Sequence, residues 1–178
     1  ATAVFLFVAI RETVVSQRAV GAVEALSRRP WTTAVLVAVL VTLASAFVSG
    51  SILGHAAITD DEHAYQFIAA TLRTGSLTAR SPGVDLDYYR EQFVVLTDKI
   101  RYGKYPIGHP LVLAAAQALG FERWALPMIT GLLTLPLTSI GLRLFGPTVS
   151  VVALALLVSS PQVLLTGATL LSQPTCAL

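Results

Sequence analysis

Three consecutive carboxylates form the chemically most distinctive stretch of this sequence, within Thr59-Asp60-Asp61-Glu62-His63-Ala64-Tyr65. They follow closely on an apolar run, and carboxylates in such a place can act as a general base or bind a cation. A structural interpretation stays open beside this one. Thr59 with Glu62 three residues later is a capping box, and Asp60 and Asp61 in the first turn favour the positive end of a helix dipole.

A second polar segment, Gly103-Lys104-Tyr105-Pro106-Ile107-Gly108-His109-Pro110, leads back into apolar sequence. At headgroup depth, the ammonium group of Lys104 can bind a lipid-linked phosphate. The alternative is a plain entry into a helix, with Pro110 in the first turn and Tyr105 as an interfacial anchor. His109 has two interpretations as well: contact with a headgroup, or a histidine satisfied at a helix start.

The elements that must position these residues are membrane helices. Hydrophobic residues make up 54% of the 178 residues, charged residues 12%, and the mean hydropathy is +0.72, which together indicate an integral membrane protein. The run from Thr32 to Gly54 has no ionisable residue, and its roughly 20 residues span the ~30 Å hydrocarbon core. A net charge of +2 gives no indication of nucleic-acid binding.

The charges predict how the chain is oriented. Four arginines and two glutamates lie between Arg11 and Arg29, so the positive-inside rule makes residues 1–30 cytoplasmic and the first span 32–54, with Trp31 at the interface. The loop 55–109 then faces outward, and it holds seven of the ten acidic residues. We expect a multi-pass protein of the inner (plasma) membrane whose polar loop is periplasmic or extracellular.

Two amphipathic helices are expected along the membrane face of this loop. The first has apolar residues at helical spacing and ends at Gly75; these residues are Tyr65, Ile68, Ala69 and Leu72. The second follows the turn signal at Ser81-Pro82-Gly83; its apolar residues are Leu86, Tyr89, Phe93 and Leu96.

Three further membrane helices are predicted at about 106–119, 125–142 and 149–171. The last should be kinked at Ser159-Ser160-Pro161, because proline removes a backbone hydrogen bond. The expected fold is therefore all-α, a polytopic transmembrane helical bundle with an outward loop. The chain begins with Ala and ends without a completed span, so we expect the N-terminal part of a larger domain, inactive by itself.

The motifs and their order resemble the GT-C membrane glycosyltransferases, in particular the branch related to protein O-mannosyltransferases and lipid A aminoarabinose transferases. The resemblance covers about residues 31–178. It rests on these segments: Asp61-Glu62-x-x-Tyr65, Ala70-x-Leu72-x-x-Gly75, Lys104-Tyr105-Pro106-x-Gly108-His109-Pro110, Gly141-Leu142-Arg143-Leu144-Phe145-Gly146, Ser159-Ser160-Pro161 and Leu171-Ser172-Gln173-Pro174-Thr175. Gln173 departs from the pattern, since many relatives carry an acidic residue or a histidine there.

The resemblance implies an inverting transfer of a sugar from a polyprenyl-phosphate donor to a hydroxyl of a lipid, glycan or protein acceptor. It implies that Asp61 is the catalytic base, and that Glu62 or Asp60 orients it or helps to hold a divalent cation, Mg²⁺ or Mn²⁺, which only some members need. Lys104 would contact the donor phosphate. The remaining substrate-binding candidates are Tyr65, Tyr105 and His109.

Two other functions compete with this one. A transporter or flippase subunit would place ionisable residues within its spans, near the middle of the bilayer. The apolar runs here have none, which favours the enzyme. A purely structural membrane subunit would use the loop carboxylates for stability alone.

Overall fold

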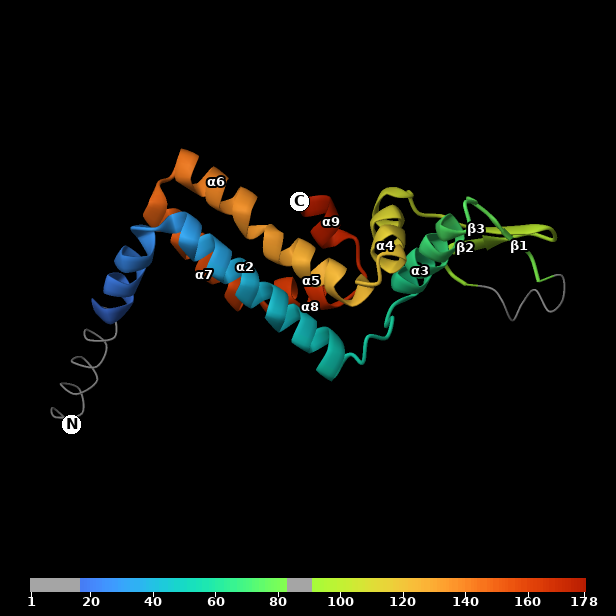
Figure 1. Cartoon of the computed structure of the whole chain (residues 1–178), viewed down its shortest axis with the longest axis horizontal. Helices are drawn as coiled ribbons and strands as arrows, with labels where there is room; N and C mark the ends of the chain where they lie inside the picture. The colour runs from blue at the N-terminus through green and yellow to red at the C-terminus, as the bar shows by residue number, and fades with distance from the viewer. Residues whose placement is uncertain (1–16, 83–90) are drawn as a thin grey trace, which may run out of the picture.

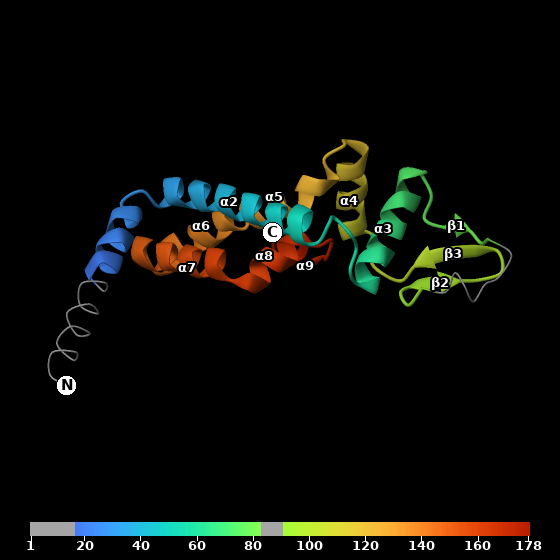
Figure 2. The same cartoon turned by 90° about the horizontal axis from the view of Figure 1, so that it is seen from below.

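The computed structural model describes residues 17–82 and 91–178. Residues 1–16 of the predicted cytoplasmic segment and the start of the second amphipathic helix lie outside these residues. Long helices run side by side in one part of the molecule, and shorter elements gather beyond their far end (Figures 1 and 2). Residues 17–27 form a helix that precedes the long helices at the opposite end.

Two continuous helices in the described part of the chain are long and apolar enough to cross a membrane. The first joins α2 (Pro30–Phe47) to a π-helical turn, Val48–Ile52. The second joins α5 (Glu122–Leu132) to α6 (Thr134–Leu144). Each spans 23 residues, and they lie where the apolar runs predict helices.

A third apolar segment is bent. Helices α7 (Pro147–Ser159) and α8 (Pro161–Ala168) meet at an angle of 60°. Ser160 caps the second helix, and Pro161 occupies its first turn, where a missing N–H costs nothing. The predicted proline kink is confirmed.

Helix α2 packs against α5, α6, α7 and α8, and its contact with α5 is close because the facing residues are small. A Cβ added at Gly131 would lie 2.6 Å from the carbonyl oxygen of Ala38 and would collide with the Thr42 hydroxyl. One turn further on, the Thr134 hydroxyl is 3.2 Å from the carbonyl oxygen of Ala34. These contacts fix how deeply α5 sits against α2.

Beyond the long helices, α3 (Asp60–Arg73) forms where the periodic pattern predicts it, and Gly75 follows at φ 76°. Its apolar side was expected to lie on the membrane face. Instead, Tyr65 and Ala69 pack against α4 (Gly108–Ala118) in a small core with Leu113. The helix predicted at about 106–119 is therefore present, but its 11 residues, about 16 Å, are too few to cross a bilayer alone. Its place in the membrane stays a prediction.

The fold is mostly helical but not all-α. A three-stranded antiparallel sheet lies beside α3 (Figure 2). Its strands are β1 (Ala79–Arg80), β2 (Val94–Leu96) and β3 (Ile100–Gly103), with β3 in the middle. The second amphipathic helix was expected to include Phe93 and Leu96. Val94 pairs with Gly103 and Leu96 with Arg101, so this end of the predicted helix is a strand.

We expect Gly131→Ala to loosen the contact between α2 and α5. The new methyl group meets backbone and hydroxyl atoms that cannot move without separating the helices, so the free energy of unfolding should fall by about 1–3 kcal/mol. Unfolding in a mild detergent titrated with a denaturing detergent measures this change. Gly21→Ala, where an added Cβ meets nothing within 4 Å, should leave stability unchanged or slightly higher. An unaltered stability of the Gly131 variant would contradict the close contact.

Candidate functional site

The first turn of α3 holds Glu62 in a buried position. The predicted cap is confirmed: the Glu62 amide donates to the Thr59 hydroxyl oxygen at 3.4 Å. The Thr59 hydroxyl donates in turn to Oε1 of Glu62 at 3.2 Å, and the Leu170 amide donates to Oε2 at 3.4 Å. The Glu62 side chain is 0% exposed, and each of its oxygens has a donor.

Asp61 faces different surroundings, because successive helix residues are turned by about 100°. Its side chain is half-buried, and its Oδ1 accepts a hydrogen bond of 2.6 Å from the Tyr105 hydroxyl. This hydrogen bond, together with burial and the Asp61 charge, raises the pKa of Tyr105 to about 12. Tyr105 therefore stays protonated at neutral pH and orients the carboxylate.

Aromatic rings continue from this pair into the core. The rings of Tyr65 and Tyr105 have centroids 4.7 Å apart, and His109 meets Tyr65 edge-on at 4.8 Å. The ring centroids of Phe93 and Tyr105 are 5.2 Å apart. The stack joins α3, the segment after β3, and α4, and so it fixes where Asp61 points.

His109 ties the end of the described chain to this core. Its Nε2 donates to the Leu170 carbonyl at 2.8 Å, which leaves Nδ1 to accept from the Thr175 hydroxyl at 2.9 Å. Burial lowers the pKa of His109, and the bond to Leu170 opposes this in part. The Tyr65 hydroxyl adds a bond of 3.2 Å to Ser172, just before α9 (Gln173–Ala177). Motif reasoning did not predict this docking.

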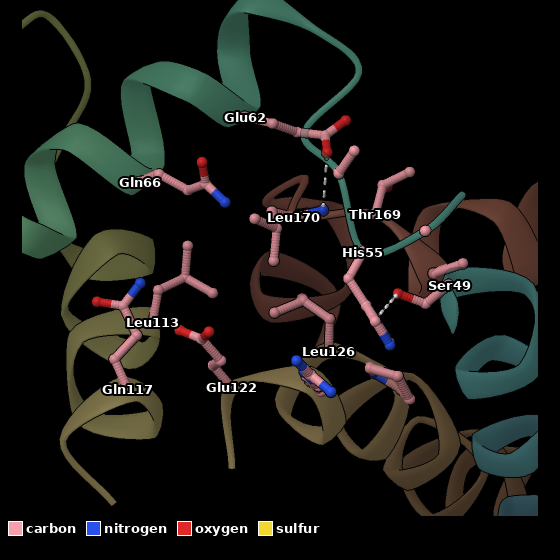
Figure 3. A pocket seen from close by; sticks show the side chains of 15 residues that line it. Ser49, His55, Glu62, Gln66, Leu113, Gln117, Glu122, Leu126, Thr169 and Leu170 are labelled. Carbon is pink, nitrogen blue, oxygen red and sulfur yellow. Dashed lines mark hydrogen bonds between the residues drawn. The ribbon is translucent and has the colours of Figure 1, made fainter. Parts of the chain in front are cut away.

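A cavity of about 320 Å³ opens on the other side of Glu62 (Figure 3). Polar side chains reach it from four parts of the chain, and leucines complete its wall. The polar residues include His55, Glu62, Gln66, Gln117, Glu122 and Arg123. Carboxylates and amides in one cavity can hydrogen-bond the hydroxyl groups of a neutral, polar ligand.

No protein-family model, curated protein or solved structure matches this chain. The resemblance to GT-C glycosyltransferases therefore stays a prediction from sequence motifs. Of the cavity residues that sequence reasoning missed, Gln66 lies four residues after Glu62 and so on the same helix face. Gln117 and Glu122 come from other elements, and no sequence signal joined them to the carboxylates.

The structure brings together most of the predicted site residues. Asp61 and Tyr105 are paired, and Tyr65 and His109 lie directly behind them. The wall of the cavity contains Glu62 but not Asp61.

Two of the predicted residues lie elsewhere. Lys104, which was predicted to contact the donor phosphate, donates from its Nζ to the Gln92 carbonyl oxygen at 2.9 Å. Asp60 is exposed, and in the described ranges no group of three potential metal-binding side chains (His, Cys, Asp or Glu) was found. Gln173, where the sequence departs from the family pattern, is the first residue of α9. A metal role for Asp60 and Glu62 stays a prediction.

We expect Asp61→Asn to return the Tyr105 pKa from about 12 toward its ordinary value of 10, because the charge and the acceptor that stabilise the neutral phenol are removed. The ultraviolet absorbance of tyrosinate, titrated with alkali, measures this change. Tyr105→Phe identifies the group by removing one late ionisation, and Asp98→Asn, which alters an exposed carboxylate beyond β2, should have no effect. A titration of the Asp61 variant identical to that of the parent would refute the pairing.

His109 should make the protein less stable in mild acid. Its folded-state pKa is lowered, so the unfolded chain binds the proton more readily, and stability is lost as pH falls below about 6.5. Thermal unfolding over roughly pH 8 to 5 tests this. The fall should be smaller in His109→Gln, whereas His63→Gln, an exposed histidine on α3, should behave like the parent. Parallel curves for the parent and His109→Gln would show that His109 is not responsible.

Proposed function

We propose that this chain is part of a membrane glycosyltransferase that moves a sugar from a polyprenyl-phosphate donor to an acceptor hydroxyl, with inversion at the anomeric carbon. One observation carries the proposal: of the three carboxylates in the first turn of α3, which follows the first long apolar helix, Asp61 is paired with a tyrosine and Glu62 lies on the wall of a polar cavity. The resemblance of the sequence motifs to GT-C enzymes supports it independently.

In this proposal Asp61 is the general base. It removes the proton of the acceptor hydroxyl while the acceptor oxygen forms a bond to C1 of the sugar. The bond from C1 to the phosphate oxygen breaks, and the polyprenyl phosphate leaves with the electron pair. Tyr105 keeps its own proton and holds one Asp61 oxygen, so the other oxygen can face the acceptor. Glu62 bounds the cavity in which hydroxyl groups bind.

The placement of charge favours an enzyme over a transporter. Neither continuous apolar helix has an ionisable residue near its middle. Pro30–Ile52 has none at all, and in Glu122–Leu144 they lie at the ends: Glu122, Arg123 and Arg143. A transport pathway needs such groups near the middle of a span. We propose that the helices form a multi-pass bundle of the inner membrane, with residues before Pro30 cytoplasmic and α3 on the outer side.

Asp61→Asn in the full-length protein should lower sugar transfer by about 10²- to 10⁴-fold, the contribution of a positioned general base. Membranes containing the protein are given polyprenyl phosphate linked to tritiated mannose or aminoarabinose, and the label that leaves the lipid carrier for acceptor fractions is counted. Asp98→Asn, an exposed carboxylate away from the cavity, is the matched control and should transfer normally.

A folding measurement separates catalysis from stability. If thermal unfolding of the Asp61 variant matches that of the parent while transfer is lost, the carboxylate acts in the reaction. Transfer close to normal in this variant would refute the assignment of Asp61. If transfer falls only in proportion to the amount of folded protein, the structural-subunit alternative stands instead.

A further inference from the structure

An apolar groove follows the contact between α2 and α5. It consists of two hollows of about 280 and about 390 Å³, both lined by Leu43. Uncharged side chains line the groove through most of its length. They include Ala38, Thr42, Ala46, Phe47, Trp124 and Met128. Several of these side chains are exposed on helices suited to a bilayer, so the groove is open to lipid.

The groove ends at two basic side chains. Arg123 and His55 line the hollow of about 390 Å³, and both also line the polar cavity beside Glu62. The groove and the cavity therefore meet at these two residues. A guanidinium group with a fixed fork of N–H donors is the side chain best suited to a phosphate at such a junction.

His55 is held at the junction in an uncommon conformation. Its φ is 58°, in the left-handed region that residues other than glycine adopt uncommonly. Its amide donates to the Ser49 carbonyl at 2.8 Å, and its Nδ1 is 3.2 Å from the Ser49 hydroxyl. Nε2 lies over Gly50, where an added Cβ would be 3.2 Å away, on the groove side. When the Ser49 hydroxyl donates to Nδ1, Nε2 carries the proton and can donate to an anion.

We propose that this groove and junction bind a single-chain lipid phosphate, with its chain between α2 and α5 and its phosphate on Arg123 and His55. An apolar chain, an anion and a hydroxyl-rich group follow one another in a lipid-phosphate sugar. The apolar groove, the two basic side chains and the polar cavity follow one another in the same order. The sugar end of this assignment rests on the proposed function; the lipid-phosphate end does not.

The assignment replaces Lys104 as the phosphate ligand. Lys104 donates to the Gln92 carbonyl beside the sheet, whereas Arg123 is shared by the groove and the cavity. Glu62 and Glu122 line the cavity but not the groove, so the negative side chains lie on the side of the neutral sugar rather than beside the lipid chain.

Equilibrium binding of tritiated farnesyl phosphate to the protein in phosphatidylcholine nanodiscs tests the site, with empty nanodiscs as the blank. Arg123→Gln should weaken binding at least about tenfold, the effect of losing a charged hydrogen bond. Arg143→Gln is the matched control and should bind normally, because Arg143 is exposed at the far end of the continuous α5–α6 helix. Ala46→Trp should also weaken binding, because it fills the groove without a change of charge.

Competition identifies the ligand. Farnesol should compete at least about tenfold more weakly than farnesyl phosphate, and neither inorganic phosphate nor phosphatidylglycerol in the nanodisc should displace it. Displacement by inorganic phosphate would indicate a free-phosphate site, and displacement by phosphatidylglycerol would indicate general headgroup binding; either result overturns the proposal. Normal binding by Arg123→Gln or Ala46→Trp, or equal binding of farnesol, overturns it too. If Arg123→Gln does not fold, Ala46→Trp and the farnesol comparison decide.

The two proposals fail separately. Farnesyl phosphate binding that depends on Arg123, with no sugar transfer by the parent, would keep the site and reject the glycosyltransferase. Transfer that depends on Asp61, with farnesyl phosphate bound normally by Arg123→Gln, would keep the enzyme and reject the site. Asp61→Asn should bind farnesyl phosphate like the parent, since Asp61 does not line the groove.

Discussion

A carboxylate taken out of water must keep hydrogen-bond donors around it, and the position of Glu62 imposes this requirement on the structure. One of its donors is the Thr59 hydroxyl, three positions before Glu62 in the sequence. The other is the Leu170 amide, 108 positions after it. Meeting the requirement brings the segment after α8 against the start of α3. The cavity lies between these parts, and α4 and α5 supply the rest of its wall (Figure 3).

The long helices supply the rigid base for this arrangement. Small residues let α5 approach α2 closely, and that approach sets the position of the first turn of α5, where Glu122 and Arg123 stand. On the opposite wall, aromatic rings lock α3 against α4. Polar side chains of α3, α4 and α5 thus converge on the cavity because α4 packs against both of the other helices.

Local signals were predictable and distant ones were not. Thr59 and Glu62 define a cap within four residues, and Pro161 bends its own backbone, so both were visible in sequence. The strand at Val94–Leu96 was missed because its apolar residues also fit a helical period, and pairing with β3 decides between the two. The hydrogen bond between Asp61 and Tyr105 was missed because the two residues are 44 positions apart and no local sequence pattern joins them.

The end of α8 at Ala168 has a wider effect than the termination of a helix. Had the helix continued, the amide and carbonyl of Leu170 would have been consumed by its own backbone ladder. Because Thr169 is extended, Leu170 is free of the helix, and it donates its N–H to Glu62 and accepts a hydrogen bond from His109 at its C=O. An acid and a base on different helices therefore share one backbone unit, and any displacement of Leu170 must strain or relax both of their bonds at once.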